Sequence, residues 1–415
     1  MLALLGLAAL TLATSALAGN ASPEPFVWPS PPEPARVRYV GSLRDEADIK
    51  GKPSGISRFL QSIVGTKSRP ARVFIRPTDV YAEDSTHLYV TDAAAQSLIR
   101  IDLAARTVVS VGTSGPGLLA RPAGVSGDGR GRIYVTDPGA RRVAVFDLEG
   151  RYLRQLGSPA TLLNPIDVAV HSASGRVFVA DSHMHQVLIF DSTGTIVGKV
   201  GKDSGSLAVR DSARAVISVD GEDANSTHGR HGASDLTQNR GGNAGEFLYP
   251  VAVAVSGDSA LYVTDALNGR VQAFDLNGVY LRQFGRLADQ PGCFARPKGI
   301  AADGDGHLYV VDAAFNNVQI FDSDGQFLLA FGKAGTGDGE FWLPLGLHID
   351  RNNRIYVADR YNGRLQIFQY LDAPEEASLG MNSGPQIPQH ADTPPPPVDP
   401  GTLGKGPGAP KGVTP

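Results

Sequence analysis

The chain repeats a pattern of four short hydrophobic runs separated by turns rich in Gly, Asp and Asn. The fourth repeat shows the order clearly, with runs at 249–255, 261–265, 270–275 and 280–285. These runs are rich in β-branched and aromatic residues and are bounded by turn residues, which predicts short strands. Each repeat therefore predicts a four-stranded antiparallel meander.

Two residue types mark the order six times along the chain. A proline opens the first run, at Pro77, Pro122, Pro165, Pro250, Pro297 and Pro344. An aspartate ends the second run, at Asp92, Asp137, Asp181, Asp265, Asp312 and Asp359. One meander cannot cover both of its faces, whereas several arranged radially bury them against one another. We therefore expect an all-β fold, a six-bladed β-propeller of four-stranded antiparallel blades.

The sixth repeat lacks a fourth run, because a proline-rich tail follows residue 371. Upstream of the first repeat, residues 37–43 (VRYVGSL) are similar to the outer run at 280–285. We expect this N-terminal strand to close the ring as the outer strand of blade six, which removes a free sheet edge. Apolar residues at helical spacing within 56–64 predict a short amphipathic helix that packs on the propeller.

The repeat resembles the NHL-repeat family of six-bladed propellers. The family's motif joins a Pro-x-Gly opening, a hydrophobic-Tyr-Val-x-Asp strand, an Asp-x-x-Asn-x-Arg turn and a hydrophobic-Phe-Asp-x-Asp-Gly ending. Residues 265–270 (DALNGR) and 359–364 (DRYNGR) match the turn, blade two keeps Arg142, and blades one, three and five depart at both places. The resemblance covers residues 37–371. It implies the fold and no single function, because this fold hosts lyases, lactonases, sensor domains and RNA-binding modules.

Composition divides the chain into a repeating middle and two atypical ends. Residues 1–18 are apolar and uncharged and predict a signal peptide, although no basic residue precedes the apolar run. We expect a Pro-rich spacer at 19–35, the propeller at 36–371 and a disordered Pro/Gly-rich tail at 372–415. Residues 202–243 interrupt the regular spacing of the repeats, and we interpret them as an insertion rather than a seventh blade. The protein is thus expected in the periplasm or secreted, touching a membrane only through an uncleaved N-terminal segment.

The net charge and the cysteine content limit the classes of partner and of covalent chemistry that we expect. The net charge of −4 and the pI of about 6.1 provide no basic field for a nucleic-acid backbone. Cys293 is the one cysteine, so no intramolecular disulfide forms, and we interpret it as a small buried hydrophobe. We predict a monomer without a cofactor.

The connectivity of a meander places certain loops on one face of the ring. The fourth-to-first and second-to-third connections share a face, which we name the insertion face because it carries 202–243. The same face has the starts of the first strands and the turns after the six aspartates. We interpret those aspartates as architectural, since a carboxylate at a strand end accepts hydrogen bonds from turn amides and recurs in every blade.

Seven residues on the insertion face are candidate ligand contacts. They are Asp79, Asp167, His183, His185, Phe315, Arg360 and Tyr361. The two aspartates stand two places after an opening proline, where the other blades have Gly or Ala. We therefore expect both at the mouth of the central channel, and a concave mouth with a few convergent polar groups is the default binding site.

Metal chemistry is the alternative for the histidines. His183 and His185, together with His228 and His231 of the insertion, could bind a transition metal, but we prefer an exposed, solvated turn. His348 lies midway along a first strand, where a hydrogen-bonded core histidine is the preferred interpretation. We assign no catalytic and no metal-ligating residue.

The sequence favours an exported, non-catalytic scaffold that binds a protein, peptide or glycan on the insertion face. The alternative is a propeller enzyme, a lyase or lactonase-like hydrolase with a metal in the channel. Asp79, Asp167 and His348 are few ligands for such a metal cage. A third hypothesis is a cell-envelope sensor or spacer held by its proline-rich ends.

Overall fold

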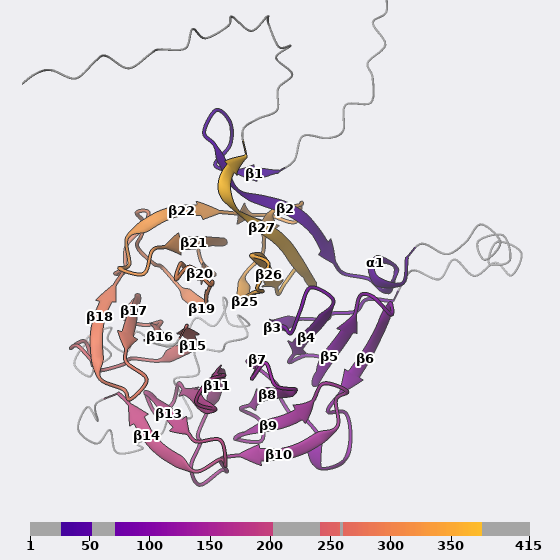
Figure 1. The fold of residues 1–415 in the computed structure, drawn as a ribbon, viewed down its shortest axis with the longest axis vertical. Coiled ribbons are helices and arrows are strands. Elements are labelled where there is room, and N and C mark those ends of the chain that lie inside the picture. Colours follow the sequence, from indigo (N-terminus) through magenta and orange to yellow (C-terminus); the bar gives the residue numbers. More distant parts are fainter. Residues whose placement is uncertain (1–25, 52–70, 202–240, 258–259, 376–415) are drawn as a thin grey trace, which may run out of the picture. The chain divides into compact units, whose positions relative to one another are not determined.

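The computed structural model describes residues 26–51, 71–201, 241–257 and 260–375. These residues form six antiparallel blades arranged in a ring (Figure 1). The first strand of each blade lies innermost, beside the central channel, and the last strand lies outermost. The chain is therefore the six-bladed propeller that the repeats predict.

The strands follow the expected order in every blade. Blade one consists of β3 (Pro77–Ala82), β4 (His87–Asp92), β5 (Ser97–Asp102) and β6 (Thr107–Val111). Blade two consists of β7 (Val125–Gly127), β8 (Arg132–Asp137), β9 (Arg142–Asp147) and β10 (Tyr152–Leu156). Blade three consists of β11 (Pro165–His171), β12 (Arg176–Asp181), β13 (Gln186–Phe190) and β14 (Ile196–Val200).

The second half of the ring is built in the same way. Blade four consists of β15 (Pro250–Ser256), β16 (Ala260–Asp265), β17 (Arg270–Phe274) and β18 (Tyr280–Phe284). Blade five consists of β19 (Pro297–Ala302), β20 (Leu308–Asp312), β21 (Asn317–Phe321) and β22 (Phe327–Phe331). Blade six consists of β25 (Pro344–Ile349), β26 (Arg354–Asp359), β27 (Arg364–Glu375) and β2 (Ala35–Leu43), with β1 (Val27–Trp28) beyond β2. Small elements complete the list: α1 (Glu46–Lys50), a 3-10 turn (Gly115–Gly117), β23 (Lys333–Ala334) and β24 (Glu340–Phe341).

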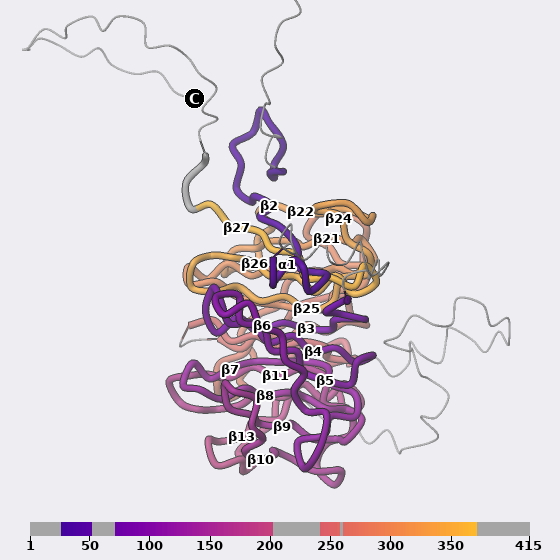
Figure 2. The backbone as a smooth tube through the Cα atoms, turned by 90° about the vertical axis from the view of Figure 1, so that its right-hand side faces the viewer, coloured from indigo at the N-terminus to yellow at the C-terminus, as the bar shows by residue number. Residues whose placement is uncertain are grey.

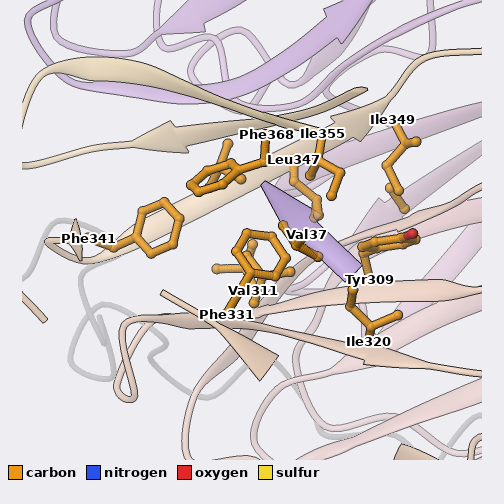
Figure 3. Packing of buried hydrophobic residues seen from close by; sticks show 13 residues of the cluster. Val37, Tyr309, Val311, Ile320, Phe331, Phe341, Leu347, Ile349, Ile355 and Phe368 are labelled. Carbon is orange, nitrogen blue, oxygen red and sulfur yellow. The ribbon is translucent and has the colours of Figure 1, made fainter. Parts of the chain in front are cut away.

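The N-terminal strand β2 lies against β27 and is the fourth strand of blade six. Tyr39 stands opposite Phe368, and Leu43 stands opposite Leu365. The two strands also lie side by side when the ring is seen from the side (Figure 2). Val37 of β2 is fully buried among residues of blades five and six (Figure 3). Strand β2 thus contributes both edge pairing and core packing.

The described part of the spacer that we predict at 19–35 contains a short strand, β1. Val27–Trp28 pairs with β2, and the ring centroid of Trp28 lies 5.9 Å from Phe331 and 5.7 Å from Phe368. Proline is tolerated in an edge strand, and the aromatic side chain gains burial there. The propeller therefore includes residues 26–35, and β27 continues past residue 371 to Glu375.

Several predicted segments lie outside the described residues. These are the signal peptide at 1–18, the rest of the spacer at 19–25, the helix within 56–64, residues 202–240 of the insertion and the tail from 376. Among the described residues, no helix has the length and apolar character needed to cross a membrane.

The hydrophobic core divides into six clusters, one at each boundary between neighbouring blades. At the boundary of blades five and six, Tyr309, Phe331, Phe341 and Phe368 are at most 1 % exposed. Burying an aromatic or large aliphatic side chain contributes about 1.5–3 kcal/mol. Strand pairing stays within each blade, so this side-chain packing between blades holds the ring together.

Candidate functional site

The six strand-ending aspartates organise the loops of the insertion face. All six are 0 % exposed. Asp312, for example, accepts hydrogen bonds from the backbone N–H groups of Ala295, Arg296, Ala314 and Phe315. Each aspartate thereby joins the loop that enters its blade to the turn after the second strand. The geometry supports the architectural interpretation, because these carboxylates point into the fold rather than toward the channel.

Blades four and six add a buried ionic cluster to this arrangement. In blade six, Arg364 Nε donates to Asp359 Oδ2 at 2.7 Å, and Arg364 Nη2 donates to the carbonyls of Gly337 and Glu340 at 2.6 and 2.7 Å. Gln366 Nε2 also donates to Glu340 O, at 2.6 Å. The cluster therefore fixes the loop that precedes β25.

The equivalent ionic cluster of blade four binds residues at the C-terminal end of the predicted insertion. In blade four, Arg270 Nε donates to Asp265 Oδ2 at 3.0 Å, and its Nη atoms donate to the carbonyls of Gly242 and Asn243. Asn268 Nδ2 donates to the carbonyl of Gly241 at 3.0 Å. Residues 241–243, which lie within the bounds 202–243 that we predict for the insertion, are thus fixed in the loop that enters blade four.

His185 occupies a position with an architectural role in four blades. The fourth residue after the aspartate has positive φ in Gln96, Arg141, His185 and Asn316. Each side chain bonds to the loop that enters the next blade: Gln96 to Ala120, Arg141 to Leu162, His185 to Tyr249 and Asn316 to Leu343. His185 Nδ1 accepts the Tyr249 N–H at 3.0 Å, so that nitrogen is engaged in joining blades.

The two predicted histidines are neighbours with different surroundings. Burial and the charge of nearby His183 lower the pKa of His185, which favours the neutral ring that accepts from Tyr249. Burial also lowers the pKa of His183, an exposed residue whose ring centroid lies 6.1 Å from that of Tyr249. His183 therefore stays available at the insertion face.

Asp79 and Asp167, which we predict at the mouth of the central channel, line its cavities, and each joins two blades. Asp79 Oδ2 accepts the Val125 N–H of blade two at 2.8 Å, and Asp167 Oδ2 accepts the Val253 N–H of blade four at 2.9 Å. A methyl group at Gly346 would overlap Asp79, and one at Gly124 would overlap Asp167. Glycine in the preceding blade thus makes room for each carboxyl group.

These two carboxyl groups separate two cavities of the channel. A cavity of about 70 Å³ opens at the insertion face, and one of about 220 Å³ extends toward the opposite face. Both aspartates line both cavities. Burial raises the pKa of Asp167 to about 7, and burial together with the charge of Asp167 holds the pKa of Asp79 well above its ordinary value.

A second group of predicted residues gathers over blades five, six and one. The Tyr361 ring has the Arg76 guanidinium 5.5 Å and the Arg360 guanidinium 5.8 Å from its centroid. Trp342 lies 5.9 Å from Tyr361 at an interplanar angle of 30° and is 50 % exposed. Phe315 is half-buried in the turn of blade five. We name Arg76, Trp342, Arg360 and Tyr361 the arginine–aromatic rim.

Two cations beside the rim were missed by the sequence analysis. Lys298, the residue after an opening proline, lines the mouth cavity, and Arg296 is the residue before that proline. Burial, with the charges of Arg296 and Arg360, lowers the pKa of Lys298 to about 8. The sequence contains a pattern that could have revealed Arg296, because Arg76, Arg121 and Arg296 all directly precede an opening proline.

Metal ligands do not converge in the part of the chain that the structure covers. There, no three His, Cys, Asp or Glu side chains gather as a metal site would require. His348 is packed edge-on against Tyr81 at 4.9 Å, and burial lowers its pKa to about 4, which fits the core histidine expected there. Cys293 is buried, and His228 and His231 lie outside the described residues.

Comparisons with known proteins agree with the fold. Residues 302–373 match a family model described as a 6-bladed beta-propeller, and residues 162–190 match the NHL repeat. No curated protein matches the sequence. A structural genomics protein of unknown function from Bacteroides thetaiotaomicron is similar in structure, with a TM-score of 0.50 and 16% identity, over 71% of this chain and 70% of that one.

Two enzymes, a lyase and a lactonase, are also similar in structure. Virginiamycin B lyase from Staphylococcus aureus has a TM-score of 0.48 and 14% identity, over 72% of this chain and 96% of its own. A gluconolactonase from Xanthomonas campestris has a TM-score of 0.48 and 15% identity, over 80% and 98%. At such identities only the fold is shared. The six blades and these two matches identify the chain as a six-bladed β-propeller with an NHL repeat at residues 162–190.

Proposed function

We propose that this protein is an exported, non-catalytic scaffold whose insertion face binds a protein or peptide segment through the arginine–aromatic rim. The observation that carries the proposal is the rim itself, in which exposed Trp342 stands beside Tyr361 and two guanidinium groups contact the Tyr361 ring. Trp, Tyr and Arg dominate the binding energy of protein interfaces. Among the three ligand classes that the sequence left open, the rim favours protein and peptide over glycan.

The rim is well suited to binding because its support is rigid. The loop that carries Trp342 is fixed by Arg364 and Gln366, and the Trp342 N–H donates to Asp359 Oδ1 at 2.8 Å. The Tyr361 N–H donates to the Trp342 carbonyl at 3.1 Å, which links the two aromatic residues through their backbones. Preorganised contacts reduce the entropy that binding costs.

Panning a random dodecapeptide library on the purified protein tests the proposal. Selected peptides should bind Trp342→Ala and Tyr361→Ala at least about tenfold more weakly by fluorescence anisotropy, as expected for hot-spot residues. Leu328→Ala is the matched control, since Leu328 is 45 % exposed on the outer strand β22. Peptides that bind both rim variants as tightly as the wild type would refute the rim as the site.

The insertion offers a second test of the same face. Its described ends, Gly201 and Gly241, belong to the connection between β14 and β15, which is a fourth-to-first connection. Deletion of residues 204–240 should weaken binding of the selected peptides while the melting temperature stays close to that of the wild type. Arg351 lines the cavity that extends toward the opposite face. If substitution of Arg351 abolishes peptide binding while the deletion variant binds fully, the binding site lies on that opposite face and the proposal is refuted.

An enzyme remains the second candidate, because one observation favours it. Asp79 and Asp167 have raised pKa values within a channel, and strongly perturbed carboxyl groups gather at catalytic sites. A lyase or lactonase-like activity would be abolished in Asp79→Ala and Asp167→Ala while affinity for the substrate is largely kept. A screen of lactones and cyclic depsipeptides, with these two variants as controls, distinguishes this candidate from the scaffold.

A further inference from the structure

The larger cavity of the channel, of about 220 Å³, extends toward the face opposite the insertion, and we name it the opposite-face cavity. Two places beyond the level of Asp79 and Asp167, the six first strands line it with Tyr81, Ser126, Ala169, Ala254, Ala301 and His348. Alanine in blades three, four and five leaves space, whereas Tyr81 and His348 pack edge-on at 4.9 Å on the other side. The cavity therefore has room for a small organic molecule.

Two carboxyl groups form the inner end of the opposite-face cavity. Asp79 Oδ2 accepts the Val125 N–H at 2.8 Å, and a methyl group at Gly124 would overlap Asp167 Oδ1. The two side chains thus approach consecutive residues of blade two. Among the described residues, neither carboxyl group forms an ion pair. A carboxylate that is largely removed from water is stabilised strongly by a cationic partner.

A guanidinium group lies at the outer end of the same cavity. Arg351 follows β25 of blade six, yet its Nη2 lies 3.7 Å from the position that a methyl carbon on Gly129 would take, in the turn between β7 and β8 of blade two. Ser172 Oγ of blade three lies 3.7 Å from the same position. Because blade one separates blade six from blade two (Figure 1), the arginine side chain extends past blade one to reach this place. Arg351 and Ser172 both line the cavity there.

The acidic groups near Arg351 are engaged by other donors. Glu83 and Asp128 lie with Arg351 around Tyr81. Glu83 accepts the Tyr81 hydroxyl at 2.8 Å, and Asp128 accepts two backbone N–H groups of its own turn at 2.8 and 3.0 Å. Asp350 accepts two backbone N–H groups and a tyrosine hydroxyl. In the part of the chain that the structure describes, Arg351 forms no ion pair, so its guanidinium can bind a ligand.

We infer that the opposite-face cavity binds a small zwitterion, with an ammonium group against Asp79 and Asp167 and a carboxylate against Arg351 and Ser172. Both contacts are charge-assisted hydrogen bonds, which are about twice as strong as neutral ones. The cavity ends are separated by the residues from Gly124 to Gly129, roughly 16 Å of extended strand at most. An α-amino acid carries both charges on one carbon and is too short, so the ligand class is an amino acid whose charges are separated by a chain.

Binding of 6-aminohexanoate tests the inference, with hexanoate and hexylamine as analogues that each carry one of the two charges. The measurement is isothermal titration calorimetry of the full chain at pH 8, where Asp167, with a pKa of about 7, is largely ionised. We expect 6-aminohexanoate to bind, and each analogue to bind at least about tenfold more weakly, because it lacks one charge-assisted contact.

Two variants remove one end of the site at a time. Arg351→Met should weaken binding of 6-aminohexanoate and hexanoate at least about tenfold and leave hexylamine within about twofold. Asp167→Asn should weaken 6-aminohexanoate and hexylamine to the same degree and leave hexanoate within about twofold. Arg130→Met is the matched control, because Arg130 is an exposed arginine next to Gly129 that lies outside the cavity lining, and it should change no affinity more than about twofold. Melting curves check that each variant folds.

Three results would overturn the inference. The first is no binding of 6-aminohexanoate, and the second is equal binding of it by the wild type and either Arg351→Met or Asp167→Asn. The third is hexanoate or hexylamine binding as tightly as 6-aminohexanoate, which would assign the cavity to an anion or a cation alone. The peptides selected on the rim should bind Arg351→Met as they bind the wild type, so the two sites are tested separately.

Discussion

Blades one and three bury carboxyl groups in a different way from blades four and six. In blades four and six, Asp265 pairs with Arg270 at 3.0 Å and Asp359 pairs with Arg364 at 2.7 Å, with every side chain at most 6 % exposed. In blades one and three, Asp79 and Asp167 receive backbone N–H donors but, among the described residues, form no ion pair. Buried carboxyl groups of this protein are thus of two kinds: those of blades four and six pair with an arginine, and those of the channel have only N–H donors.

The two arrangements also serve different parts of the ring. The arginine clusters hold the long loops that lead into blades four and six, and the latter loop carries Trp342. The unpaired carboxyl groups instead line the channel and bridge neighbouring blades. Removing one partner of a buried ion pair leaves an uncompensated charge, whereas removing the charge of an unpaired carboxyl group relieves a desolvation cost.

Breaking the cluster of blade six should have the largest effect. In Arg364→Met, Asp359 loses its cation, and the carbonyls of Gly337 and Glu340 each lose one of their donors. We expect the free energy of unfolding to fall by about 3–5 kcal/mol, measured by urea denaturation.

Arg142→Met is the matched control, because Arg142 occupies the same position of blade two and its guanidinium bonds to groups other than the blade's aspartate. Its guanidinium donates to the carbonyls of Pro116 and Leu118 and to Gln155, near the surface. Loss of these bonds should cost about 1–2 kcal/mol. Equal losses in the two variants would mean that the ion pair itself contributes nothing.

The contact between blades six and one should be the next most sensitive. In Gly346→Ala, the new methyl carbon would lie 2.7 Å from Asp79 Cα, so the innermost strands β25 and β3 must move apart. Such overpacking costs about 1–3 kcal/mol. Differential scanning calorimetry should show a lower melting temperature for Gly346→Ala and little change for Gly304→Ala, where nothing lies within 4 Å of the added carbon. Similar melting temperatures for the two variants would contradict close packing at the channel.

Most of the fold could be predicted because it is periodic, whereas much of the site could not. The prolines and aspartates recur in every blade, and the match of 265–270 and 359–364 to the family turn located both arginine clusters. Trp342 and Lys298 were not predicted as site residues, because each residue type occurs at its position in one blade only and no repetition drew attention to it. His185 was predicted as a ligand contact because its type stands out, yet its position has the same structural role in three other blades. Val27–Trp28 was hidden by its flanking prolines.

The smallest predicted effect concerns the unpaired carboxyl of Asp167. Its pKa is about 7 in the folded chain, against about 3.9 in an unfolded chain. Because the folded value is the higher one, the stability that this group contributes is complete below pH 4 and is lost as the pH rises to 7. The loss amounts to at most about 1.4 kcal/mol per pH unit.

Asparagine at this position tests both the sign and the comparison. Asp167→Asn keeps an acceptor for the Val253 N–H and removes the ionisable group, so its stability should vary less between pH 4.5 and 8 than that of the wild type. At pH 8 it should unfold at a higher urea concentration than the wild type, whereas Asp359→Asn should unfold at a lower one, since Arg364 then lacks its carboxylate. The same substitution thus has opposite signs in the two kinds of blade. If both variants are destabilised at pH 8, the channel carboxylate is ionised without cost, and the distinction between the two arrangements fails.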